Sequence, residues 1–235
     1  MVGGHAKPNP MHLAATEIYR APAKPGLYAW YVEPRFTVQD LEWPENGSDV
    51  AGGWLLDETL RFSSFFAQPR VRLSGKAPFE TTWRAAISVE GFGSPAPPPD
   101  RQKAAGQILQ TALSESRERR VLVEALNSAI PYFAAPCYIG VATNLNSRLN
   151  EHMNSFDRAT KSLEAASKQE LQEVWESGPD FGSRAVAAGL SSEELSAWIL
   201  PFELNPPLTI EQLRHSLEAA EWVLNRTYRP PFGRK

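Results

Sequence analysis

With 235 residues, of which 42% are hydrophobic and 22% charged, the chain has the composition of a soluble globular protein with one large or two small domains. The sequence contains no run near the roughly 20 apolar residues that cross a bilayer, and its first ten residues show no signal-peptide pattern. Its one cysteine, Cys137, cannot form an internal disulfide. We therefore expect a cytoplasmic protein without a membrane role.

The net charge of −3 argues against a tight, non-specific nucleic-acid binder, but the charges are segregated along the chain. Residues 36–60 contain acids and no Lys or Arg, whereas residues 61–84 contain a single acid, Glu80. The tail from Leu224 onward contains no acid at all. Either basic stretch is a candidate for phosphate contacts, and a solvated face is the alternative for residues 61–84. The candidate DNA-binding residues are Arg70, Arg72, Lys76, Arg226 and Arg229.

The first half of the chain combines strand-like and helix-like patterns. Residues 24–32 alternate around aromatic and branched side chains, which predicts a strand that Pro34 ends. The pattern then predicts a short helix at 56–66, strands at 71–73 and 81–89, an extended linker at 94–99 and a helix at 100–129 that Asp100 caps.

The second half contains most of the regular pattern. It predicts a strand at 136–141, followed by a helix that Thr143 or Asn144 caps. A second helix is expected at 158–177, and a buried strand at 195–204, where an internal proline favours a sheet edge. Thr209 is expected to cap a last helix that runs to about Tyr228, with Glu211 and Gln212 in its first turn.

These elements predict an α/β (α+β) protein with a small three-stranded sheet flanked by helices. We expect a discontinuous core formed by residues 24–33 and 136–235, with an N-terminal extension at 1–23. Residues 34–135 are then an α+β insertion of about 100 residues after the first strand.

Five side chains in this arrangement can together hydrolyse a phosphodiester, which needs an attacking water, a cation and stabilisation of the leaving oxygen. Glu221 can hold a hard divalent cation, and Arg148 offers a fixed, always-charged fork to a phosphate oxygen. Tyr28 and Tyr138, on strands that face one cleft, can orient or deprotonate the water. His152 lies one helical turn after Arg148 and is the alternative base or a phosphate contact.

Taken singly, each of these residues has a simpler interpretation. A tyrosine after Gly-Leu is more often a packed aromatic, a histidine on a helix is more often at the surface or a cap, and a glutamate on an amphipathic helix is usually solvated. The conjunction of all five favours phosphodiester hydrolysis.

The same residues give the chain its resemblance to the GIY-YIG nuclease superfamily. The first motif corresponds to Gly26-Leu27-Tyr28 and the second to Tyr138-Ile139-Gly140. The arginine of the family falls on Arg148, in the run YIGVATNLNSRLNEH, and His152 matches a histidine of several restriction-type members. The metal-binding glutamate falls on Glu221, nine residues before Pro230, with Glu218 as the competing choice.

The sequence departs from the family pattern in two places. The terminal asparagine of the family would fall on Gly233, which has no side chain, and Asn225 within the helix is the candidate substitute. The second departure is the long insertion between the two motifs, which family members usually join by a short hairpin.

The resemblance implies an endonuclease that hydrolyses DNA with one Mg²⁺ or Mn²⁺ ion per active site, in a restriction, phage-defence, mobile-element or repair setting. The insertion would contribute target recognition or a lid, and a homodimer is plausible because one active site cuts one strand. Two alternatives stay open: a non-catalytic nucleic-acid-binding or regulatory module on the same core, and a nuclease directed at RNA.

Overall fold

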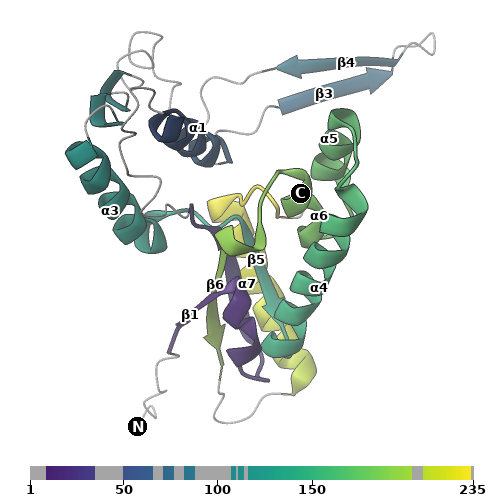
Figure 1. Cartoon of the computed structure of the whole chain (residues 1–235). Helices are drawn as coiled ribbons and strands as arrows, with labels where there is room; N and C mark the ends of the chain where they lie inside the picture. The colour runs from purple at the N-terminus through teal and green to yellow at the C-terminus, as the bar shows by residue number, and fades with distance from the viewer. Residues whose placement is uncertain are drawn as a thin grey trace. The chain divides into compact units, whose positions relative to one another are not determined.

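The computed structural model describes residues 9–34, 50–65, 71–76, 82–87, 107–109, 111–113, 116–202 and 209–233 (Figure 1). The chain divides into two compact units. Unit 1 combines Met1–Arg35 with Asn127–Lys235, and unit 2 is Phe36–Leu126. Each unit is described by itself below.

Unit 1 is built on a four-stranded antiparallel sheet with the strand order β1-β6-β2-β5 (Figure 1). The strands are β1 (Met11–Ala14), β2 (Gly26–Val32), β5 (Tyr138–Ala142) and β6 (Leu195–Pro201). Along β2, buried residues alternate with half-buried ones, as expected when the two faces of a sheet are covered unequally. Tyr28 and Trp30 therefore lie on the more buried face, while Ala29 and Tyr31 lie on the other.

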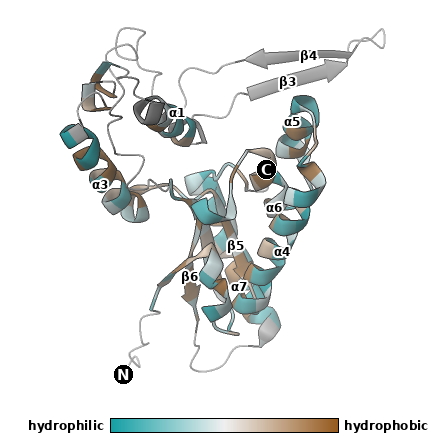
Figure 2. Ribbon diagram, viewed as in Figure 1, coloured by the Kyte–Doolittle hydropathy of each residue, from teal (hydrophilic) through white to brown (hydrophobic). Residues whose placement is uncertain are grey.

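Helices cover the face of the sheet that carries Tyr28 and Trp30. They are α4 (Leu145–Leu163) and α6 (Phe181–Ala187), and α5 (Lys168–Ser177) packs against α6. The 3-10 helix η1 (Ala15–Arg20) precedes them in the chain and packs against α4. Trp30 is fully buried and stacks on Phe181 of α6 with 5.4 Å between ring centroids. The visible surface of α4 is mostly hydrophilic (Figure 2), because its apolar side chains, such as Leu145 and Leu149, point into this core.

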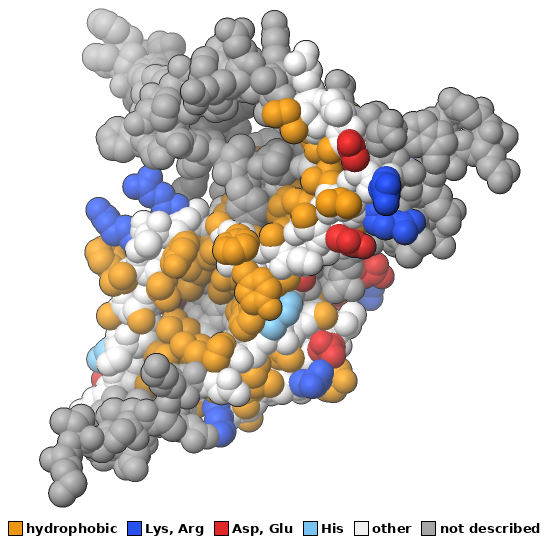
Figure 3. Space-filling view, turned by 90° about the vertical axis from the view of Figure 1, so that its left-hand side faces the viewer, with side chains coloured by type: hydrophobic (Ala, Val, Ile, Leu, Met, Phe, Trp, Pro, Cys, Tyr) orange, Lys and Arg blue, Asp and Glu red, His pale blue; other side chains and the backbone are white. Residues whose placement is uncertain are grey.

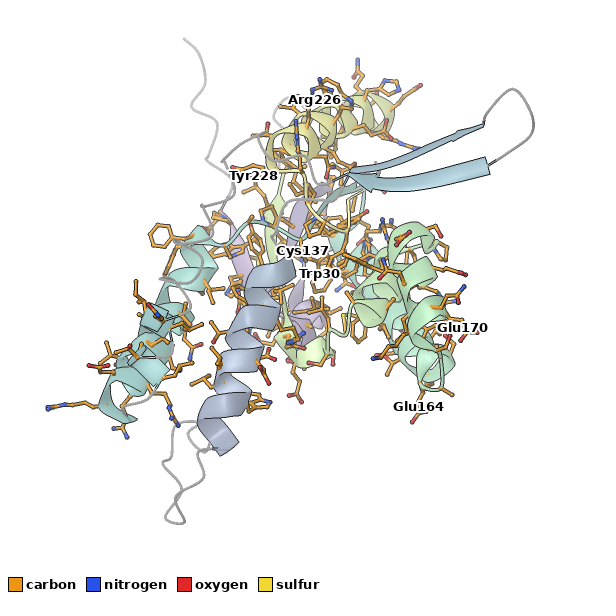
Figure 4. The ribbon with its side chains drawn as sticks, turned by 90° about the horizontal axis from the view of Figure 1, so that it is seen from above. Trp30, Cys137, Glu164, Glu170, Arg226 and Tyr228 are labelled. Atoms are coloured by element: carbon orange, nitrogen blue, oxygen red, sulfur yellow. The ribbon has the colours of Figure 1, made fainter. Side chains whose placement is uncertain are left out.

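The last helix, α7 (Ile210–Tyr228), packs mainly against the edge strand β5 and also against β2. Tyr228 at its end lies close enough to Tyr31 to help burial raise the pKa of that phenol. Because Tyr31 lies on the opposite face of β2 from Tyr28, the end of α7 covers that second face. Figure 4 shows Arg226 and Tyr228 of α7 on one side of Trp30 and Cys137, and α5 with Glu170 on another.

Unit 2 contains the helix α1 (Val50–Phe65) and an antiparallel pair of strands, β3 (Val71–Lys76) and β4 (Thr82–Ile87). The helix α3 (Ser116–Phe133) begins in unit 2 and ends in unit 1. A small cluster of buried residues, Leu55, Leu113 and Val123, forms the core of unit 2.

The structure confirms the mixed α and β class and many of the expected elements. The strands expected at 24–32, 136–141, 71–73 and 81–89 are present as β2, β5, β3 and β4. The last helix is also confirmed, because Thr209 caps α7 and forms a reciprocal capping box with Gln212.

Three expectations about the elements of unit 1 are wrong. The sheet has four strands and not three, because the N-terminal extension adds β1 beside β6. The strand β6 is interior and not at an edge, because Pro201 is its last residue and opposes Gly26 without interrupting the pairing. The helix expected at 158–177 is split, since α4 runs on to Leu163 and Ser167 caps a separate α5.

In unit 2, the helix expected at 56–66 begins six residues earlier, at Val50. Within the helix expected at 100–129, residues 107–109 and 111–113 are helical, and α3 starts at Ser116 and continues to Phe133. The proposed linker at 94–99 and the cap Asp100 lie outside the described residues.

Candidate active site

Tyr28 lies at the centre of the candidate site, opposite Gly140 in the β2–β5 pair. A Cβ on Gly140 would lie 2.5 Å from the Tyr28 hydroxyl and 2.9 Å from Cε1 of Tyr138. The two tyrosine rings, whose centroids are 6.1 Å apart, therefore occupy the space that a side chain at position 140 would need. This explains why the second motif needs a glycine after its tyrosine and isoleucine.

The first glycine of the other motif positions α4. A Cβ on Gly26 would lie 2.4 Å from the carbonyl oxygen of Leu200 and 2.7 Å from Cδ1 of Leu145, the first residue of α4. The N-terminus of α4 is also fixed by the backbone N–H of Leu145, which donates to the Lys24 carbonyl at 2.9 Å. Arg148 and His152, one turn apart on α4, are thereby directed at Tyr28.

The Tyr28 hydroxyl joins three of the candidate residues. It lies 2.8 Å from Nε2 of His152 and 3.3 Å from Nε of Arg148. The ring of Tyr138 is 5.3 Å from the His152 ring, centroid to centroid. Tyr28, Tyr138, Arg148 and His152 thus form one cluster, which we call the Tyr28 cluster.

Burial sets the charge state of the Tyr28 cluster. Burial lowers the pKa of His152, and the positive charges of Arg148 and Arg184 add to the decrease against the opposing effect of Asp180, so that the pKa falls to about 3. Burial also raises the pKa of Tyr28 well above its usual 10, and Tyr138 adds to the rise while Arg148 opposes it. Both groups are therefore uncharged at neutral pH.

The protons of the cluster follow from these charge states. The guanidinium of Arg148 only donates, so the Tyr28 oxygen accepts from it. The phenolic O–H is then left to donate to Nε2 of a neutral His152. Arg148 keeps its charge, because hydrogen bonds with Glu151 and Tyr28 raise its pKa even though burial acts in the opposite direction.

Only one member of the Tyr28 cluster reaches solvent appreciably. Tyr28, His152 and Tyr138 are 2%, 4% and 6% exposed, whereas the side chain of Arg148 is 39% exposed and pairs with Glu151 at 2.8 Å. A phosphate that approaches from solvent would therefore meet Arg148 before it meets the Tyr28 hydroxyl.

The two candidate carboxylates of α7 differ in exposure. Glu218 is exposed, and it forms an ion pair with Arg214 at 2.7 Å. Glu221 is half-buried, on the stripe of α7 that includes the buried Leu217 and the half-buried Leu224. Of the two, Glu221 is the less exposed.

The structure places Glu221 on a different element from the Tyr28 cluster. The carboxylate that shifts the pKa of His152 is that of Asp180, the cap of α6. The carboxylate that shifts the pKa of Arg148 is that of Glu151. Glu221 is not among the groups that shift the pKa of Tyr28, Arg148 or His152.

The residues fit a magnesium ion only as a site with very few protein ligands, which this ion accepts. Within the described residues, no group of three or more His, Cys, Asp or Glu side chains can hold a metal. Mg²⁺ often takes one or two carboxylates and completes its shell with water and substrate phosphate. Glu221 offers a half-buried, hard oxygen donor of this kind.

The space beside Gly233 is filled by Pro230 and Asn225. A Cβ on Gly233 would lie 2.9 Å from Cγ of Pro230 and 3.2 Å from Oδ1 of Asn225, and this oxygen is buried with no hydrogen-bond partner among the described residues. Gly233 itself is held in a turn by its N–H, which donates to the Pro230 carbonyl at 2.9 Å. The amide of Asn225, the candidate substitute for the terminal asparagine of the family, therefore lies next to Gly233.

The candidate DNA-binding residues have different standing. Arg226 and Arg229 are exposed at the end of α7. The backbones of Arg72 and Lys76 lie in β3, where they oppose Ala86 and Thr82. Arg70 lies outside the described residues.

One part of the site was not expected from the sequence. Phe181 of α6 packs its ring against those of Trp30, Tyr138 and His152, at centroid distances of 5.2–5.4 Å. Asp180 caps this short helix by accepting a hydrogen bond from the Ser183 N–H at 2.8 Å. The sequence Gly178-Pro179-Asp180 contained this signal of a helix start.

A separate pocket of about 510 Å³ is lined by residues of β1, β6 and the end of α3, including Tyr132. His12 stacks on Trp198 there at 4.8 Å between ring centroids. Trp198 opposes Ala29, so the pocket lies on the sheet face opposite to Tyr28. Hydrophobic side chains gather on the side of the molecule that Figure 3 shows.

Neither a scan of the chain against protein-family models nor searches of curated proteins and of solved structures give a match. The resemblance to GIY-YIG nucleases therefore depends on the residues and the geometry given above. No helix among the described residues is long and apolar enough to cross a membrane.

Proposed function

We propose that the protein is a divalent-metal-dependent endonuclease of the GIY-YIG type that hydrolyses phosphodiester bonds in DNA. The observation that carries the proposal is the contact of the Tyr28 hydroxyl with both His152 and Arg148. Tyr28 is more than 100 positions away from Arg148 and His152 in the chain, and the contact between them supports a shared site.

Arg148 is the phosphate-binding group in this proposal. Its guanidinium is permanently charged and partly exposed, and it lies directly beside the Tyr28 hydroxyl. A phosphate bound by Arg148 would therefore place its neighbouring water near the hydroxyls of Tyr28 and Tyr138, which can orient that water for attack.

Glu221 would hold the Mg²⁺ or Mn²⁺ ion, which supplies charge neutralisation and lowers the pKa of a bound water. The protein's own groups are poor bases in its absence. His152, with a pKa of about 3, accepts a proton weakly, and the raised pKa of Tyr28 disfavours its ionisation. The proposed activity is therefore strictly metal-dependent.

The nuclease core in this proposal consists of residues 24–33 and 136–235, in which β2 lies between β5 and β6. Residues 34–135 would be the inserted recognition or lid segment. The division of the chain at residues 36 and 126 into two compact units supports a separate role for this segment.

A second candidate is a non-catalytic nucleic-acid-binding module on the same core. Two observations favour it: Tyr28 and Tyr138 are almost completely buried, and Glu221 lies on α7, a different element from those that carry the Tyr28 cluster. In this case the cluster would stabilise the fold and would perform no chemistry.

Incubation of the protein with plasmid, single-stranded and branched DNA, in Mg²⁺, Mn²⁺ or EDTA, separates the two candidates. The proposed nuclease cleaves at least one of these substrates with metal and none with EDTA. Binding of DNA without cleavage under every condition would favour the non-catalytic module. A parallel set of RNA substrates tests whether RNA is cleaved in preference to DNA.

A further inference from the structure

The outward side of α7 carries an unusual combination of exposed residues. Trp222 is 63% exposed, Val223 and Tyr228 are each 53% exposed, and Arg226 is exposed as well. The guanidinium carbon of Arg226 lies 5.5 Å from the centre of the Trp222 ring, so the two side chains form a stacked pair. Several large apolar side chains exposed together at one end of a helix are typical of a surface that binds a partner.

The charge of this surface is positive. Residues 222–233 contain Arg226 and Arg229 and no acid, and the sequence continues with Arg234 and Lys235. The nearest exposed acid on α7, Glu218, is already paired with Arg214. The complementary partner is therefore an anion.

Arg229 adds an independent observation. It follows the last residue of α7 with a φ of 47°, in the left-handed region that favours glycine, and it is the one described non-glycine residue with a positive φ. An arginine in this conformation costs free energy relative to glycine. The backbone conformation therefore does not explain an arginine at this position, and we attribute the arginine to a role of its exposed side chain.

We propose that the end of α7 binds an unpaired stretch of DNA strand, with a base stacked on Trp222 and Arg226 and with phosphates held by Arg226 and Arg229. A single strand offers both partners that this surface needs: exposed bases, which stack on aromatic rings, and phosphates, which arginines neutralise. A duplex would hide the faces of its bases from Trp222. The proposal rests on the proposed function, since it names the form of DNA that the nuclease contacts.

Binding measurements on the full chain in EDTA test the proposal without requiring cleavage. The probes are a single-stranded DNA of about 12 nucleotides, an abasic strand of the same length, and the corresponding duplex, each followed by fluorescence anisotropy. Trp222→Ala should weaken binding of the base-bearing single strand by roughly 5- to 100-fold. It should leave binding of the abasic strand unchanged, because that strand has phosphates but no ring to stack.

Two further variants separate stacking from charge and from folding. Trp175→Ala, at a 40% exposed tryptophan of α5, is the matched control and should bind like the wild type. Arg229→Gly should raise the melting temperature by relieving the positive φ, yet reduce the slope of log affinity against log salt by about 0.7 for the lost phosphate contact. If Arg229 had only a structural role, the more stable Arg229→Gly protein would bind DNA as tightly as the wild type.

Several results would overturn the proposal: wild-type affinity in Trp222→Ala, an equal loss for the base-bearing and abasic strands, or a loss confined to the duplex. Sedimentation that shows a wild-type dimer broken by Trp222→Ala would assign the surface to a second copy of the chain. A protein that binds the single strand through Trp222 but never cleaves DNA would refute the proposed function and leave this inference intact.

Discussion

At the scale of single residues, the almost completely buried Tyr28 hydroxyl forms hydrogen bonds with His152 and Arg148. His152 is held uncharged there by burial and by the positive Arg148, and its pKa falls to about 3. Because the unfolded chain returns this imidazole to its ordinary pKa near 6.5, the shift links protonation to folding.

We expect His152 to make the fold acid-sensitive. Between pH 6.5 and pH 3 the unfolded chain binds a proton at this histidine and the native protein does not, so the free energy of unfolding falls as the pH falls. The contribution is at most about 1.4 kcal/mol per pH unit. His152→Phe keeps a ring among Tyr28, Tyr138 and Phe181 but removes the titration, so its stability should decline less over this window.

Urea denaturation at pH 7, 5 and 4 measures the effect. The loss of the Tyr28 hydrogen bond lowers the stability of His152→Phe at every pH, so the comparison uses the pH dependence and not the absolute value. His215→Asn, at an exposed histidine of α7, is the control and should keep the dependence of stability on pH that the wild type shows. Identical pH profiles for the wild type and His152→Phe would contradict the assignment.

The two glutamates of α7 provide a matched pair for the metal site. Glu221→Gln keeps size and packing but removes the charge that would hold the cation, and we expect cleavage to fall by several orders of magnitude. Glu218→Gln removes only an exposed partner of Arg214, an ion pair that water screens, and should remain active. Cleavage rates at fixed Mg²⁺ decide, and activity lost in Glu218→Gln alone would show that the other carboxylate holds the metal.

At the scale of elements, glycines set the distance between strands and helices around the site. Gly140→Ala would place a methyl group 2.5 Å from the Tyr28 hydroxyl, and β5 cannot move without breaking its pairing with β2. We expect a loss of about 1–3 kcal/mol in the free energy of unfolding, as for other overpacked cores. In Gly53→Ala, a Cβ on α1 meets nothing within 4 Å, so the same change should stabilise that exposed helix by about 0.5–1 kcal/mol.

Denaturation of the two glycine variants, followed by far-ultraviolet circular dichroism, tests this contrast. Wild-type stability in Gly140→Ala would show that the Tyr28 ring does not rest on Gly140. A destabilised Gly53→Ala would show that α1 has neighbours at this position.

Much of the element pattern could be predicted because local chemistry determines it. Thr209 and Gln212 form the capping box that starts α7, and the alternation in β2 marks its buried face. The split between α4 and α5 was missed because Ala165 and Ala166 favour helix, although Ser167 and Glu170 carry a second capping box.

Tertiary context explains the elements that were wrong. The four residues of β1, Met-His-Leu-Ala, have no β-branched side chain, and they become a strand because they pair with β6. That pairing also makes β6 interior, which Pro201 alone did not indicate.

For the candidate site, spacing along the chain predicted the residues but not their environment. Arg148 and His152 lie on one face of α4, as their spacing required, and both reach Tyr28. The near-complete burial of Tyr28 depends on Phe181 and Gly140, which arrive from other elements. No sequence pattern gives the resulting pKa shifts, because burial arises only when the whole core assembles.

At the scale of the whole molecule, two basic regions are candidates for the proposed contact with DNA. The end of α7 belongs to unit 1, whereas Arg70, Arg72 and Lys76 belong to unit 2. The two regions are separate in the chain. Their contributions to binding can therefore be separated by charge reversal.

If both regions contact phosphates, Arg70, Arg72 and Lys76 changed to Glu together should weaken duplex binding and flatten its salt dependence by about 0.9 units of log–log slope per lost contact. Arg226 and Arg229 changed to Glu should do the same at the end of α7. Cleavage at saturating DNA should survive in the first set, because the Tyr28 cluster and Glu221 lie in unit 1. Salt titrations of both sets give the two slopes.

The comparison also decides the role of the insertion. If only the α7 set loses affinity, unit 2 does not contact DNA, and a lid or a docking site for another protein becomes the better hypothesis for residues 34–135. If only the unit 2 set loses affinity, recognition resides in the insertion, because the exposed arginines of α7 then contribute nothing to duplex binding. Equal losses would mean that one stretch of DNA is bound by both units at once, since phosphates neutralised by either set appear in the same salt slope.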